Sequence, residues 1–131
     1  MSYTSQAAAY REMEVLSATP GQLAVIVYDH LLVSLRRARI ALDGGSFELR
    51  SATLEKCRAI ITELLVTLDH ERGGTLAQEL SSLYTFFLSE LVDVGMNPDA
   101  GRLDRITGMV SELRDAFVQA AAVAEGKEPG A

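Results

Sequence analysis

The stretch LAQELSSLYTFFLSELVDVG, residues 76–95, decides the fold. Its large apolar residues recur at steps of three and four, the spacing that places side chains on one face of an α-helix. These residues are Leu76, Leu80, Leu83, Phe87, Leu91 and Val94. A helix with such a face gains most of its stability when the face packs against other helices. The stretch therefore predicts one helix of a bundle.

Three further segments show the same helical spacing, and short turn signals separate them. The turns are predicted at residues 43–46 (DGGS), 72–75 (RGGT) and 95–99 (GMNPD), where Asn97-Pro98 can start a helix, and Thr19-Pro20 is typical of another helix start. The predicted helices are 19–42, 47–70, 75–95 and 98–124. Connections this short make successive helices antiparallel neighbours, so the pattern predicts an all-α, antiparallel up-down-up-down four-helix bundle. We expect a single domain, residues 1–131, in which residues 1–18 form an N-terminal segment or short helix packing across the bundle.

The composition argues against several classes of partner. The chain has 131 residues, 48% of them hydrophobic, and a net charge of -6. A negative surface repels nucleic acid phosphates and anionic lipid, so we expect no nucleic acid binding. The apolar run 23–35 is too short to span a bilayer, so we expect no membrane insertion. The single cysteine, Cys57, lies on an apolar stripe and the N-terminus lacks a secretory signal pattern, so we expect a cytoplasmic protein.

The sequence lacks the patterns that catalysis or metal binding needs in a helical bundle. A carboxylate-bridged di-iron site uses inward Glu-x-x-His pairs, but Val27 and Thr67 stand three residues before His30 and His70. Neither glycine pair has the flanking pattern of a phosphate-binding loop, and no nucleophile motif is present. We therefore expect no enzyme activity, no catalytic residues, no cofactor and no metal.

The helices carry more apolar side chains than one inward face requires. On the first helix, a sufficient inward face consists of Ala24, Tyr28, Leu31, Leu35, Ala38 and Leu42. Large apolar residues beyond the expected stripes form what we term the apolar excess: Val25, Ile26, Leu32, Val33, Ile60, Leu65, Tyr84 and Leu88. Such a surface is typical of a binding site, because apolar grooves between helices accept amphipathic helices. Three occupants are open at this point: the segment before Pro20, a protein partner, or a second copy of the chain.

Several motifs in a fixed order resemble the FliS family of flagellar secretion chaperones, which hold flagellin for export. They are Ala9-Tyr10 with Val15, SATPGQL (residues 17–23), Tyr28-Asp29, Ala38, ELLVTLDHERGG (residues 63–74), Leu80, Leu83 with Tyr84, Leu103 and Glu112-Leu113-Arg114. Three positions depart from the family pattern: Thr19 stands for serine or aspartate, His30 for a common glycine and Phe117 for a common tryptophan. The His30 change bears on the shape of the groove beside the first helix.

The resemblance implies a bacterial cytosolic bundle that binds the disordered C-terminal region of flagellin, prevents premature polymerisation and supports secretion. It also implies delivery to the flagellar export gate and a segment around Tyr10 that occupies part of the client's groove. The expected partner-binding residues are Tyr10, Val15, Ile60, Ile61, Leu64, Leu65, Leu68, Tyr84 and Leu88. Of these, Ile61, Leu64 and Leu68 lie on the core stripe, where packing is the simpler role. The alternative is a self-associating structural or adaptor bundle, such as a homodimer, with no flagellar client.

Overall fold

Each helix of the bundle starts and stops at residues that satisfy the free ends of its backbone. The computed structural model describes residues 20–124, which form α2 (Pro20–Gly44), α3 (Phe47–Val66), α4 (His70–Met96) and α5 (Ala100–Ala124). The Ser46 and Asp69 side chains accept hydrogen bonds from the backbone N–H groups of Leu49 and Arg72 at the starts of α3 and α4. Such caps stabilise a helix start because the first N–H groups of a helix have no partner within it.

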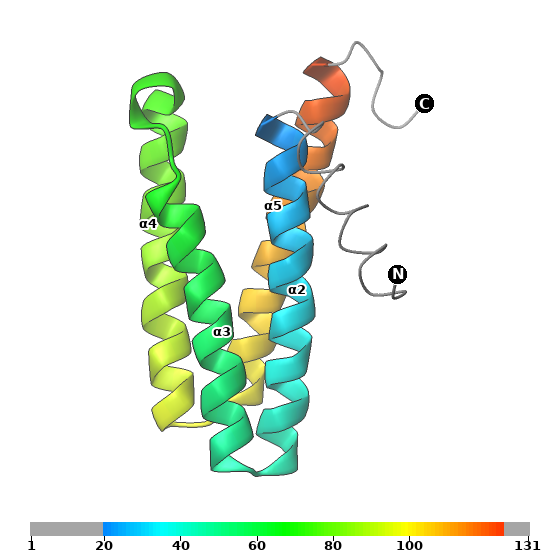
Figure 1. Cartoon of the computed structure of the whole chain (residues 1–131), viewed down its shortest axis with the longest axis vertical. Coiled ribbons are helices and arrows are strands. Elements are labelled where there is room, and N and C mark those ends of the chain that lie inside the picture. Colours follow the sequence, from blue (N-terminus) through cyan, green and yellow to red (C-terminus); the bar gives the residue numbers. More distant parts are fainter. Residues whose placement is uncertain (1–19, 125–131) are drawn as a thin grey trace, which may run out of the picture.

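The four helices run alternately up and down, which confirms the predicted antiparallel bundle (Figure 1). The connections are residues 45–46, 67–69 and 97–99. Helix α2 packs extensively along both α3 and α5, whereas α4 and α5 approach each other closely at few positions. In Figure 1 the α3–α4 hairpin diverges from α2 and α5 toward the end at which α2 begins.

Helix α3 ends, and α4 starts, earlier than expected. The glycine pattern predicts a helix to residue 70 and a turn at 72–75, but α3 ends at Val66 and α4 starts at His70. Asp69 is the reason, because its carboxylate accepts the Arg72 N–H at 3.1 Å and starts α4 before the glycines. The glycine pair still interrupts the helix, since Gly74 has φ +50° and ψ −124°, far from helical values.

The last connection also differs from the expected one. Asn97-Pro98 is predicted to start a helix, but Asn97 ends α4 and its N–H donates to the Asp93 carbonyl at 2.7 Å. Asp99 takes over the start of α5, with its carboxylate accepting the Arg102 N–H at 3.1 Å. An aspartate is at least as good an N-cap as an asparagine, so the start moves two residues along the chain.

The buried core lies mostly on the predicted stripes, but individual positions differ. Leu32, assigned to the apolar excess, is buried, because α2 packs against both α3 and α5 and so buries a wider arc than one stripe. On α4, Tyr84 is 3% exposed and belongs to the core, whereas Leu76 is 55% exposed. The buried α4 residues are Ala77, Leu80, Tyr84, Phe87, Leu91 and Val94.

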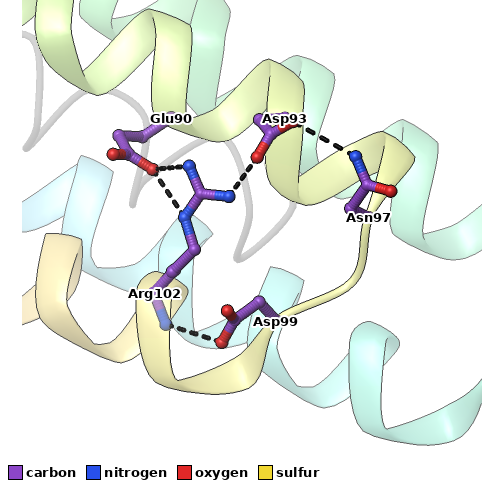
Figure 2. A network of polar contacts seen from close by, with 5 residues as sticks. All are labelled: Glu90, Asp93, Asn97, Asp99 and Arg102. Atoms are coloured by element: carbon purple, nitrogen blue, oxygen red, sulfur yellow. Dashed lines mark hydrogen bonds and ion pairs between the residues drawn. The ribbon is translucent and has the colours of Figure 1, made fainter.

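An ion-pair network joins α4 to α5 near the turn between them (Figure 2). The Arg102 guanidinium donates to Glu90, with a Nε–Oε2 distance of 2.8 Å, and to the Asp93 carboxylate. The Asn97 amide also donates to Asp93. We term Glu90, Asp93, Asn97, Asp99 and Arg102 the Arg102 network. It connects the two helices that otherwise have the sparsest contact of any adjacent pair.

Candidate binding groove

An apolar groove opens at the end of the bundle where α2 begins and α5 ends. Its volume is about 690 Å³, and all four described helices contribute to its walls. The apolar lining residues are Leu23, Ala24, Val27, Tyr28, Leu64, Leu68, Leu76, Ala77, Leu80, Tyr84 and Phe117. A concave apolar site of this size falls in the range of pockets that bind ligands.

The groove exists because burial declines along the helices toward this end. On α5, Leu103 and Val110 are fully buried, Phe117 is half-buried and Ala120 is exposed, although all four lie on one helical stripe. On α2, every residue from Leu23 to Val27 is half-buried. Side chains of residues 20–124 therefore do not fill the interior here, and apolar surface faces the opening.

A pair of tyrosines from opposite helices forms the inner wall of the groove. The hydroxyl oxygens of Tyr28 on α2 and Tyr84 on α4 are 2.5 Å apart and share a hydrogen bond. The Tyr28 ring also contacts the Phe117 ring, with centroids 5.3 Å apart. Burial raises the pKa of both tyrosine hydroxyls, and for Tyr28 the hydrogen bond to Tyr84 raises it further. Both hydroxyls therefore stay protonated and neutral at physiological pH.

The rim of the groove is polar and exposed to solvent. Glu63, Asp69 and Arg72 line its edge. The Arg72 Nε and Asp69 Oδ2 atoms are 3.8 Å apart, but an ion pair this exposed contributes little stability. An apolar interior with a charged rim is the arrangement that accepts one face of an amphipathic helix and leaves its other face in water.

The predicted partner-binding residues fall into four groups. Leu64, Leu68 and Tyr84 line the groove. Ile61 is fully buried and belongs to the core. Three others, Ile60, Leu65 and Leu88, are half-buried, pack against the core and do not line the groove. Tyr10 and Val15 lie outside the described residues.

Sequence reasoning assigned several groove residues to the core instead. Leu76, Leu80 and Phe117 lie on predicted core stripes, yet they line the groove. Two signals could have indicated the opening: the unbroken apolar run 23–27 and the glycine pair Gly73-Gly74, of which Gly73 lines the groove. An apolar run without a polar side does not match a surface helix, which keeps one face polar.

The described residues contain neither a metal-binding cluster nor an activated thiol. Within residues 20–124, no cluster of three or more His, Cys, Asp or Glu side chains is placed to hold a metal ion. Cys57 is buried, and burial raises the pKa of its thiol to about 12, so it is a poor nucleophile. As to membranes, none of the helices between Pro20 and Ala124 is long and apolar enough to cross one.

Comparison with known proteins identifies the family. The model of the family described as flagellar protein FliS matches residues 3–124. The flagellar secretion chaperone FliS of Bacillus subtilis (strain 168) is 33% identical over 112 residues, which are 86% of this chain and 83% of that protein. Its counterpart in Salmonella typhimurium is 33% identical over 109 residues, 82% of this chain and 81% of that protein. The flagellar secretion chaperone FliSB of Pseudomonas aeruginosa is 29% identical over 106 residues, 81% of this chain and 84% of that protein. The resemblance seen in the sequence is thus confirmed, and the chain belongs to the FliS family of flagellar secretion chaperones, which is not a class of enzymes.

Proposed function

We propose that this protein binds the disordered C-terminal region of flagellin in the bacterial cytosol, prevents its premature polymerisation and supports its secretion. The observation that carries the proposal is the apolar groove of about 690 Å³. The relatives' names support a flagellar client. In this proposal the complex is then delivered to the flagellar export gate, where the client leaves the groove.

The groove is suited to one amphipathic helix of the client. Leu64, Leu76 and Leu80 supply apolar contact from two helices, and the charged rim stays in water. A disordered segment loses roughly 2–5 kcal/mol or more when it becomes ordered, so it needs a large interface. We therefore extend the client contact beyond the groove to Ile60, Leu65 and Leu88, which are half-buried. Ile61, which is fully buried, acts in this proposal through the packing that supports them.

We assign the segment before Pro20 the role of a removable cover. Tyr10, Met13 and Val15 are among its large apolar residues, and α2 begins at the open end of the bundle directly after it. A cover that competes with the client lowers the apparent affinity, because only the uncovered fraction can bind. Deleting residues 1–15, or replacing Tyr10 with alanine, should therefore change the affinity or the binding rate for flagellin. Unchanged affinity and kinetics in both variants would exclude a cover.

The groove itself is tested with a matched pair of substitutions. Leu76 is 55% exposed and lines the groove, whereas Val66 is 75% exposed and does not. Leu76→Asp should weaken flagellin binding by roughly 10-fold or more, because the client would desolvate a carboxylate. Val66→Asp should leave the affinity unchanged. Isothermal titration with flagellin and with flagellin lacking its C-terminal region measures both effects. Equal affinity of the two variants would contradict the proposal.

Self-association is the competing use of the same surface. Sedimentation of the isolated protein over a dilution range distinguishes self-association from flagellin binding by a monomer, because an obligate homodimer loses stability on dilution. A concentration-independent monomer that binds flagellin supports the proposal. A stable homodimer that binds no flagellin would replace it with a structural or adaptor role.

A further inference from the structure

The Tyr28–Tyr84 pair is an unusual feature of an otherwise apolar wall. The two side chains come from helices that are diagonal in the bundle, and they are 0% and 3% exposed. Both residues line the groove, where they lie beneath the surface that an occupant would contact, and only Tyr84 keeps a small exposed fraction. A polar group at the bottom of an apolar groove costs free energy unless it is hydrogen-bonded. The pair therefore restricts which groups of an occupant can pack against this part of the lining more than the apolar side chains do.

Counting hydrogens shows that the pair is incomplete on its own. Each tyrosine hydroxyl has one hydrogen to donate. The contact between the two oxygens uses one of these hydrogens and leaves the other. Among residues 20–124, neither hydroxyl has a second hydrogen-bond partner. A buried donor without an acceptor is costly, so an occupant that supplies an acceptor gains affinity over one that does not.

We propose that the Tyr28–Tyr84 pair donates a hydrogen bond to an amide carbonyl of the bound flagellin segment and thereby selects which stretch of the client occupies the groove. The inference rests on the proposed function of the groove. Most carbonyls inside a helix are already bonded, so the acceptor is one of two kinds. It is either an Asn or Gln side chain or a backbone carbonyl at the end of the bound helix.

The charges around the groove favour a neutral acceptor over a carboxylate. The rim holds two acidic side chains, Glu63 and Asp69, against one basic side chain, Arg72. A client carboxylate would meet this negative rim and would also lose its hydration inside the groove. The hydroxyls themselves remain donors at any physiological pH, because burial raises the pKa of both. The selection is therefore for a neutral polar atom at one place in an apolar segment.

The test removes the hydroxyls without changing the shape of the rings. The variants Tyr28→Phe, Tyr84→Phe and the double substitution are titrated with flagellin from the source bacterium, and their thermal unfolding is measured. The hydroxyl that faces the client supplies the bond, and the other only orients it. One single substitution should therefore weaken binding by about 10-fold, the other by less, and the double by as much as the stronger single.

A purely structural hydrogen bond predicts a different result. It would lower the melting temperature in both single variants and leave the affinity of the folded protein unchanged. Affinity within about two-fold of the wild type in all three variants would therefore overturn the inference. Leu76→Ala serves as the control, because it removes apolar contact in the groove but no hydrogen bond. If the wild-type protein fails to bind flagellin, the proposed function is wrong. If the wild type binds flagellin, the phenylalanine variants bind it with the same affinity and Leu76→Ala binds it more weakly, only the inference is wrong.

Discussion

Replacing Gly74 with alanine tests the break in α4 that shapes one edge of the groove. Gly74 has φ +50° and ψ −124°, and an L-residue held in such a region costs about 1–3 kcal/mol. An added Cβ would meet no atom within 4 Å, so backbone strain is the whole cost. Alanine also reduces the freedom of the unfolded chain, which returns about 0.4–1 kcal/mol. We expect a net loss of about 1–2 kcal/mol in the free energy of unfolding.

Gly108 provides the matched control for this substitution. It is exposed within α5, and an added Cβ there would also meet no atom within 4 Å. Because its backbone is helical, Gly108→Ala should stabilise the protein by about 1 kcal/mol. The two variants should thus differ by about 2–3 kcal/mol. At about 4 °C per kcal/mol, their melting temperatures should differ by roughly 8–12 °C, as measured by circular dichroism.

The comparison can refute the reasoning directly. If Gly74→Ala melts as high as Gly108→Ala, residue 74 tolerates a side chain and the break in α4 carries no strain. Binding gives a second readout, because Arg72 and Gly73 precede the break and line the groove. A Gly74→Ala protein that stays folded should bind flagellin more weakly, whereas Gly108→Ala should bind it as the wild type does.

Three further predictions concern Arg102, Cys57 and Gly73. Arg102 lowers the pKa of Asp93, so this pair contributes stability above the unfolded-state pKa of about 3.9 and loses that contribution as the pH falls through the lower folded value. Arg102→Ala should therefore flatten the acid limb of a stability–pH curve, and an unaltered limb would contradict this role of the pair. The Cys57 thiol, with a pKa raised to about 12, should react with iodoacetamide far more slowly in the folded than in the unfolded protein at mildly alkaline pH. Equal rates would mean that the thiol is accessible. Gly73→Ala should destabilise the protein, because its Cβ would lie 2.7 Å from the Ala77 Cβ, and an unchanged melting temperature would show that the first turn of α4 shifts freely.

The fold could be predicted because every helix carries a long apolar stripe between clear turn signals. The sequence did not allow us to predict which residues of α4 form its buried stripe. Both Leu76-Leu80-Leu83-Phe87 and Ala77-Leu80-Tyr84-Phe87 follow steps of three and four. Hydrophobicity favours the leucines, but the helix buries the second set. The hydrogen bond between Tyr84 and Tyr28 accompanies this choice, and it depends on a residue 56 positions away.

The groove was harder to predict than the bundle for a related reason. Periodicity shows which side of a helix is apolar, but it does not show where two helices diverge. The stripe of α5 continues unchanged through Phe117, although burial has already declined there. Tertiary contacts decide where the helices diverge, because α4 and α5 meet at few positions apart from the Arg102 network.

The Arg102 network ties α4 to α5 at the end of the bundle opposite the groove. Asp93 is tied to α5, whereas Leu76 lies 17 residues earlier on α4, about 25 Å away at 1.5 Å per residue. A tilt of α4 by about 5° around its tied end would displace Leu76 by roughly 2 Å, by simple lever geometry. Few α4–α5 contacts oppose such a tilt. A tilt of α4 together with α3 would therefore widen the groove end of the bundle, while the Arg102 network would hold the opposite end in place.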